Sequence, residues 1–317
     1  FTKKFGLITG VRYEHTKISG AFEGLENSFQ NEYDNWLPNI TLSHKIGKMN
    51  TLKFSFNQRI QRPSLRFINP FRDISNNRDI NQGNPDLEPE LNTQYEVSYN
   101  TFIKGVLVNV SGFYRKTTDI IENILVIDEN GVATTTYQNV GENNSLGMNL
   151  FTSATLFKIW TLRGGFNLYT YDASGQIGDQ TVSRQAVIRD GNINSNLHLK
   201  KDWVIDLFGF YRAPRQTLQG TYPSFSLMSI GVRKEIWNKR ASIGLRIVEP
   251  FFANKEFGSE LESATFRQTS VFAIPFRSVG VNFSCKFGKL DYNKRARRSK
   301  IDNDDQKPDG GGGGDQF

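Results

Sequence analysis

The stretch from Ser278 to Gly288 carries an apolar side chain at every second position. Because successive side chains of a β-strand point to opposite faces, this alternation predicts a strand with one apolar and one polar face. The alternation lasts about ten residues, the length that a tilted strand needs to cross a bilayer. The apolar face of such a strand meets either the core of a β-sandwich or the lipid around a transmembrane barrel with a wet interior. In the second case the lipid-facing side chains of this last strand are Val281, Phe283, Cys285 and Phe287.

Composition favours the barrel. Apolar residues make up 37% of the 317 residues, and the mean hydropathy is −0.49. Aromatic residues nevertheless reach 13%, with 25 Phe, which argues against general disorder. A transmembrane barrel spends half of each strand on polar interior residues and carries aromatic girdles, so it combines these two properties. No apolar run approaches the roughly 18 residues of a membrane-spanning helix.

The connections between predicted strands alternate in length. Short turns are expected near residues 47–50, 103–105, 157–160, 200–202 and 237–239, and longer links near 19–34, 61–90, 172–183, 213–221 and 250–263. Short periplasmic turns alternating with long outer loops are typical of outer-membrane barrels, whereas the Greek-key crossings of a sandwich give no such alternation. We therefore predict an all-β fold, an antiparallel transmembrane β-barrel with about 12 strands, over residues 1–288. If the last strand descends to the periplasm, every long link lies outside the cell.

Two of these strands are predicted to be long. One runs from Val106 to Ile127, and its return arm, after a hairpin at Asn130-Gly131, runs from Tyr137 to Phe157. The stretch from Gln61 to Glu90 lacks periodicity and contains four prolines, which predicts a loop. The last strand is predicted to begin as early as Ala264 and to continue to Gly288.

The composition changes at Lys289. A basic cluster, an acidic cluster and five consecutive glycines follow, which predicts a disordered tail over residues 289–317. The topology above places this tail in the periplasm, as a solvated segment, as a basic collar that touches inner-leaflet headgroups, or as a docking tail for a periplasmic partner. The chain begins at Phe1 rather than at Met, which indicates a piece of a longer precursor.

The loop from Gln61 to Glu90 carries recognisable motifs. They are Arg62-Pro63-Ser64-Leu65, Asn69-Pro70-Phe71 and Gly83-Asn84-Pro85-Asp86-Leu87-Glu88-Pro89-Glu90, followed downstream by Phe113-Tyr114-Arg115, Asp119-Ile120-Ile121, Tyr137-Gln138-Asn139 and Phe287-Gly288-Lys289. Together they resemble TonB-dependent outer-membrane receptors, and most closely the outer-membrane β-barrel family common in the Bacteroidota. The resemblance covers nearly the whole chain.

The resemblance implies a larger barrel of about 22 strands filled by an N-terminal plug. This chain would then be the C-terminal half of the barrel, with neither the plug nor the segment that contacts TonB. A complete barrel of about 12 strands is the alternative, because the count is even. The partner of the last strand is upstream of Phe1 in the first case and the strand Phe5–Tyr13 in the second.

The motif loop is expected to be structural. Proline fixes φ and asparagine makes local turn hydrogen bonds, so both residue types suit the folding of a long loop. The residues assigned to this role are Arg62, Pro63, Asn69, Pro70, Gly83, Asn84, Pro85 and Glu90. Charged residues opposite the apolar positions are candidates for lining the lumen or contacting a plug: Arg12, Glu14, Lys53, Arg59, Arg163 and Arg246.

No pattern indicates catalysis, a metal site or a cofactor. His15, His44 and His198 fall on different predicted strands, and the single Cys285 lies on an apolar face. The net charge of +7 is scattered over alternating strands, which argues against nucleic-acid binding.

Two functions follow from the barrel. The first is the barrel of a receptor that imports a ligand across the outer membrane, such as a chelated metal, a glycan or a peptide fragment. The second is a non-transporting structural barrel subunit of an outer-membrane complex. The expected partners are outer-membrane lipid and lipopolysaccharide, a plug and TonB if the chain is part of a receptor, and other outer-membrane or periplasmic proteins. A soluble β-sandwich binding module is a third alternative.

Overall fold

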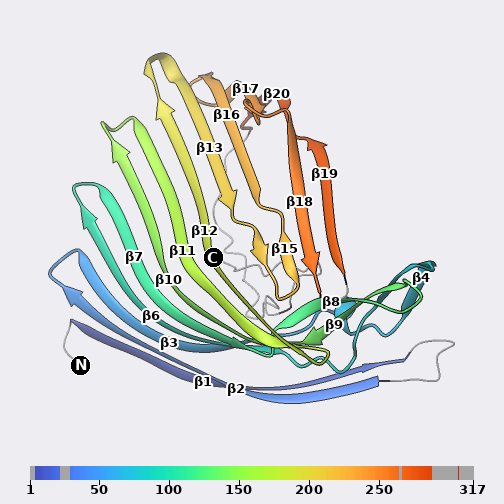
Figure 1. The fold of residues 1–317 in the computed structure, drawn as a ribbon. Helices are drawn as coiled ribbons and strands as arrows, with labels where there is room; N and C mark the ends of the chain where they lie inside the picture. The colour runs from blue at the N-terminus through green and yellow to red at the C-terminus, as the bar shows by residue number, and fades with distance from the viewer. Residues whose placement is uncertain (1–3, 22–28, 264–265, 288–305, 307–317) are drawn as a thin grey trace.

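A computed structural model describes residues 4–21, 29–263, 266–287 and 306 of the chain. Its main feature is a sheet of twelve strands, here called the wall, in which every neighbouring pair is antiparallel and follows the chain order. Figure 1 shows the wall curved into a trough, and β1 and β20 are its two unpaired edges. The strands are β1 (Phe5–Gly20), β2 (Phe29–Ile46), β3 (Asn50–Gln61), β6 (Glu90–Ile103), β7 (Val106–Thr118), β10 (Gly141–Leu156), β11 (Trp160–Ile177), β12 (Gln180–His198), β13 (Trp203–Arg212), β16 (Phe225–Ile236), β17 (Ala241–Val248) and β20 (Ser278–Cys285).

The strand count and the antiparallel order of the wall confirm the predicted fold class, although the sheet of this chain is not closed. The short turns are also confirmed, because β2–β3, β6–β7, β10–β11, β12–β13 and β16–β17 are joined by a few residues each. These turns lie at one end of the wall, here called the turn end, and the long links lie at the other, the loop end. The link expected at 172–183 is much shorter than predicted, because β11 continues to Ile177 and β12 begins at Gln180.

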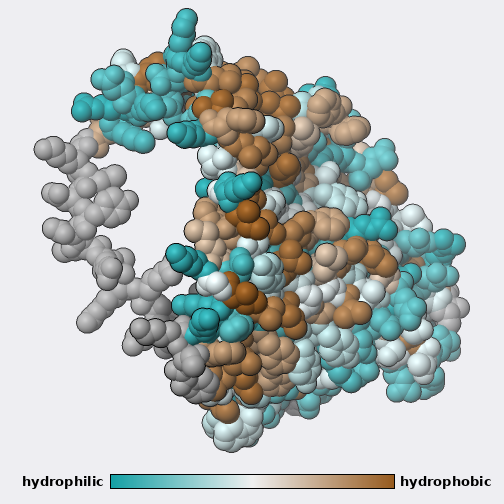
Figure 2. Space-filling model, turned by 90° about the vertical axis from the view of Figure 1, so that its left-hand side faces the viewer, coloured by the Kyte–Doolittle hydropathy of each residue, from teal (hydrophilic) through white to brown (hydrophobic). Residues whose placement is uncertain are grey.

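The register keeps most apolar and polar positions of the wall on separate faces, with β13, which has Phe208 and Phe210 on the polar side, as an exception. Leu245 lies opposite Val281 and Ile243 opposite Phe283, while Gly244 lies opposite Asn282. We call the face with Val281 the outer face and the face with Asn282 the inner face. Figure 2 shows apolar side chains gathered over much of the visible wall. The separation follows from the period of two in the side-chain direction of paired strands.

Two small sheets occupy the loop end, where the sequence predicted loops. The first contains β4 (Arg72–Asn76), β5 (Asp79–Gln82), β9 (Ala133–Asn139) and β8 (Ile121–Ile127), with β5 and β9 parallel. A short helix, α1 (Leu65–Ile68), precedes β4. The second contains β14 (Arg215–Gln216), β15 (Gly220–Tyr222), β18 (Asn254–Glu262) and β19 (Arg267–Pro275). The links at 61–90 and 250–263 are long, as predicted, but they contain short strands that the sequence did not predict.

The two long strands predicted around the Asn130-Gly131 hairpin were wrong, because each is divided by a bend. Asp119 has φ of 58° and lies between β7 and β8, and Gly141, the first residue of β10, has φ of 137° where β10 follows β9. A Cβ on Gly141 would lie 2.1 Å from the carbonyl oxygen of Ser174, so a larger residue could not pass so close to β11. The bend turns β8 and β9 away from the wall and into the first small sheet.

The predicted last strand divides as well. Residues 278–285 form β20, whereas 267–275 form β19 and pair with β18. Two clusters of buried apolar side chains lie at the loop end, while a few others, such as Val204 and Ala241, are buried near the turn end. One cluster contains Phe67, Ile68, Leu87 and Ile121, and the other contains Ile124, Val140, Ala173 and Leu218.

The predicted tail at 289–317 lies outside the described residues except for Gln306. That residue forms an isolated parallel bridge with Arg62, at the loop end of β3. β20 ends at the opposite, turn end, where Lys286 N donates to Arg240 O over 2.8 Å. A periplasmic position for the tail stays a prediction.

Candidate functional site

The first motif residue, Arg62, ties the end of β3 to the inner face of β1. Its guanidinium pairs with Glu14, and its Nε donates to Thr16 Oγ1 over 3.2 Å. Glu14 Oε1 also forms an ion pair with Arg12 Nε at 2.7 Å, and the side chains of Arg62 and Glu14 are only 17% exposed. Charge-assisted hydrogen bonds of this kind are stronger than neutral ones, so they can anchor the start of a long loop.

The Gly83-Asn84 pair closes a compact turn against α1. Gly83 N donates to Asn69 O at 2.9 Å, and Asn84 N donates to Phe67 O at 2.7 Å. A Cβ on Gly83 would lie 2.4 Å from Asn69 O and 2.6 Å from Phe67 O, so only glycine fits without a backbone shift.

The downstream Tyr137-Gln138-Asn139 motif binds the same loop. Asn139 exchanges two hydrogen bonds of 3.0 Å with the backbone of Glu88 and donates a third, 2.7 Å long, to Asp119 O. Asn84 Nδ2 donates to Tyr137 O at 3.0 Å, and the Tyr137 ring stacks on Phe67 with centroids 4.2 Å apart. Motifs separated by about fifty residues in the sequence therefore form one unit.

Glu90 and Asn31 fix this unit to the wall. Glu90 is 4% exposed, and its Oε1 accepts from Ile121 N at 2.7 Å. Asn31, on the inner face of β2, donates to Leu87 O at 2.9 Å. We call the unit formed by residues 62–90 together with β8 and β9 the motif platform. The contacts of Arg62, Gly83, Asn84 and Glu90 are consistent with the structural role predicted for the motif loop, which stays a prediction. The inner-face partners place the platform inside the trough.

The second small sheet is joined to the motif platform by hydrogen bonds between side chains and backbone groups, in place of strand pairing. Gln219 Oε1 accepts from Leu125 N at 2.9 Å, and its Nε2 donates to Leu125 O at 3.1 Å. Glu122, 7% exposed, accepts from Leu218 N at 2.8 Å through Oε2. Arg215 stacks over the Tyr222 ring at 4.0 Å, and burial lowers its pKa. Sequence reasoning did not single out Glu122 or Gln219, because these contacts join segments almost a hundred residues apart.

The predicted lumen-lining residues all lie on the inner face. The register places Arg12 and Glu14 on β1, Lys53 and Arg59 on β3, Arg163 on β11 and Arg246 on β17, each facing the same side as Asn282. The six residues are spread over four strands of the wall. Among them, Arg12 and Glu14 form an ion pair.

A polar hollow of about 400 Å³ lies on the inner face near the turn end. Amides, hydroxyls and guanidinium groups line it, including Asn194, Ser229, Arg246, Asn282 and Ser284. Asp206, which also lines the hollow, accepts from Arg233 Nε at 3.1 Å and from Asn196 Nδ2 at 2.5 Å. Polar groups in such a hollow can remain hydrated or bind a polar partner.

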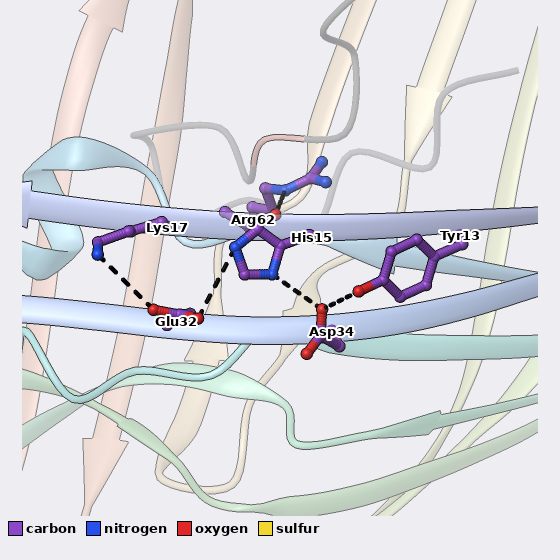
Figure 3. Close-up of polar contacts among 7 residues, drawn as sticks. Tyr13, His15, Lys17, Glu32, Asp34 and Arg62 are labelled. Atoms are coloured by element: carbon purple, nitrogen blue, oxygen red, sulfur yellow. Dashed lines mark hydrogen bonds and ion pairs between the residues drawn. The ribbon is translucent and has the colours of Figure 1, made fainter.

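On the outer face, apolar side chains are followed by aromatic side chains toward both ends of the wall. On β1 and β2 the exposed apolar pairs end at Tyr13 and Trp36, whose rings lie 4.9 Å apart. Beyond them, toward the loop end, Asp34 accepts from Tyr13 Oη at 2.6 Å and contacts His15 Nδ1 at 2.9 Å, and Lys17 lies 3.9 Å from Glu32 (Figure 3). At the turn end, Trp237 meets the edge of Phe283 at 6.4 Å, and Lys234 lies over Trp203 at 5.6 Å. An apolar band between two aromatic rows is typical of a lipid-facing barrel surface.

The last-strand residues lie on this outer face. Val281 is 75% exposed, Phe283 61% and Phe287 88%, while Cys285 is half-buried and has a free thiol. The described residues contain no group of three or more His, Cys, Asp or Glu side chains that could hold a metal ion. In the same residues, no helix is long and apolar enough to cross a membrane.

The comparison with protein families identifies the chain. Residues 1–284 match the model described as "Outer membrane protein beta-barrel family", so the chain belongs to that family. This confirms the family predicted from the motifs, whereas the Bacteroidota attribution stays a prediction. No curated protein matches the sequence.

Solved structures share the fold at low identity. The copper transporter OprC matches with a TM-score of 0.63 and 14% identity over 90% of this chain and 45% of its own. The ferric enterobactin receptor PfeA from Pseudomonas aeruginosa, in complex with enterobactin, gives 0.58 and 14% over 90% and 44%. The FrpB iron transporter from Neisseria meningitidis gives 0.55 and 14% over 90% and 44%. The chain thus spans less than half the length of these structures.

Proposed function

We propose that this chain forms part of the barrel of an outer-membrane receptor that imports a ligand across the outer membrane. The observation that carries the proposal is the two-sided wall, with an exposed apolar outer face and a polar inner face on which the motif platform is built. The outer face would meet lipid through Val281, Phe283 and Phe287, and the inner face would line a wet lumen. The proposed role is not catalytic.

The similar structures support a ligand class. They are a copper transporter, a receptor bound to enterobactin and an iron transporter, so we infer that a metal or a metal chelate is the cargo to test first. A plug from outside this chain would fill the lumen, and TonB would supply the energy for import. The charged inner-face residues, such as Arg163 and Arg246, would contact the plug or the permeating ligand.

The test uses the full-length protein in its native host. Cells that carry it should accumulate radiolabelled copper, free iron or iron–enterobactin in an energy-dependent way, and cells lacking the gene should not. A variant with Asn139→Asp would disturb the motif platform and should reduce uptake, whereas Asn130→Asp, on the exposed hairpin, should not. Recovery of the protein without detergent would contradict the membrane location. A folded barrel with no energised uptake of any tested cargo would favour the structural subunit instead.

A further inference from the structure

The free edges of the sheets are not equally protected. A sheet edge exposes unpaired N–H and C=O groups, and proteins usually shield long ones with charges, bulges or cover. β4 is an edge of only five residues with a register shift between Asp73 and Asn76, and Asp73 Oδ1 accepts from Ser75 N within it. The edge of β8 is covered by the Gln219 amide, and β14 has two residues.

Within the part of the chain that the structure describes, the edge of β19 has no such protection. It runs for nine residues, pairs with β18 without a register shift, and carries no charge from Gln268 to Pro275. Val271 is 65% exposed, and Phe272 and Ile274 on the opposite face are also exposed. A long, flat, apolar edge of this kind is a template for another strand.

The backbone groups on this edge can be assigned. Ser263 N donates to Phe266 O at one end of the β18–β19 ladder, and Phe276 N donates to Ala253 O at the other end. The pairs Ser263 with Phe266 and Ala253 with Phe276 are therefore hydrogen-bonded pairs. Because bonded and non-bonded pairs alternate in an antiparallel ladder, the N–H groups of Thr269, Val271 and Ala273 point away from β18.

The same edge continues into the wall. Lys286 N donates to Arg240 O, so the alternation leaves the N–H groups of Val279, Val281 and Phe283 on the side of β20 that faces away from β17. β19 and β20 are separated only by Phe276 and Arg277. Among the described residues, one nearly continuous free edge therefore runs from Arg267 to Cys285.

We propose that the strand that closes the barrel beside β20 continues past the membrane and pairs with β19 in the outer loop region. The occupant is a segment of the same protein outside this chain, since the similar structures are more than twice as long as the part of them that it covers. One antiparallel strand, or a strand and the hairpin that follows it, would cover both edges. The inference rests on the proposed barrel. It adds that the pairing between the closing strand and the end of this chain extends past the membrane-spanning part, from β20 to β19.

Residue-resolved hydrogen exchange on the full-length protein in detergent tests the proposal. The amides of Thr269, Val271 and Ala273 should exchange about a hundredfold or more slower than those on the edge of β4, without any added ligand. The amides of Val279 and Val281 report barrel closure separately. Slow exchange there with fast exchange in β19 would overturn the proposal and leave the barrel intact, whereas fast exchange at both would also contradict the barrel.

Proline substitutions provide a second readout. Val271→Pro removes an N–H that the β18 pairing does not use, and it should speed exchange at Thr269 and Ala273 in the full-length protein. Phe272→Pro removes a bond to β18 and is the matched control, expected to disturb β18 whether or not an outside strand is present. Protection of β19 that appears only after an extended peptide is added would assign the edge to a ligand and overturn the intramolecular pairing.

Discussion

Gly83 shows at the scale of single residues why the motif loop needs its sequence. The Gly83→Ala substitution places a methyl group against Asn69 O and Phe67 O, which are backbone atoms that cannot rotate away. We expect a loss of about 1–3 kcal/mol in the free energy of unfolding, the usual cost of overpacking. Denaturant unfolding in detergent measures it. Gly112→Ala is the control, because its Cβ would meet only Gly147 O at 3.9 Å, and an equal loss in both variants would contradict the argument.

Asn139 tests the hydrogen bonds between motifs. Asn139→Asp keeps the acceptor for Glu88 N but replaces the two donors to Glu88 O and Asp119 O with a carboxylate oxygen. Unsatisfied carbonyls and charge repulsion should cost about 1–3 kcal/mol. The platform should then show a lower thermal midpoint. Protonation of the new carboxyl should restore part of the stability at acid pH, and no pH dependence relative to Asn130→Asp would refute this.

β20 carries the prediction at the scale of one element. Val281 is the central outer-face residue of the strand, so Val281→Arg should cost about 2–4 kcal/mol if it faces the middle of a bilayer. Phe283→Arg should cost less, because its contact with Trp237 places it near the turn-end aromatic row. The yield of heat-modifiable barrel in outer membranes measures both. Asn282→Arg, on the inner face of the same strand, should be tolerated, and equal yields for Val281→Arg and Asn282→Arg would reverse the assignment of the faces.

The junction between the two small sheets belongs to the scale of the whole molecule. Gln219→Leu keeps the side-chain volume but removes both hydrogen bonds to the Leu125 backbone. If the outer loops act as one body, hydrogen exchange should become faster in β8 and in β15 together. The expected decrease in the free energy of local opening is about 1–3 kcal/mol. The control is Gln180→Leu, at the exposed β11–β12 turn. Acceleration confined to β15 would show that the loops move independently.

The sequence by itself determined the wall. Its alternating apolar positions specify strands and faces through local geometry, and the same alternation puts the six charged residues on one face of the wall. Whether they line a lumen stays a prediction. Only the tertiary structure decided that the loops at 61–90 and 250–263 form small sheets, and that the strands predicted at 106–127 and 137–157 bend. Those outcomes depend on contacts such as Asn139 with Glu88 and Gln219 with Leu125, between segments far apart in the chain. A period-two pattern reports the environment of one strand's faces, and it carries no record of which distant backbone group will satisfy a buried amide.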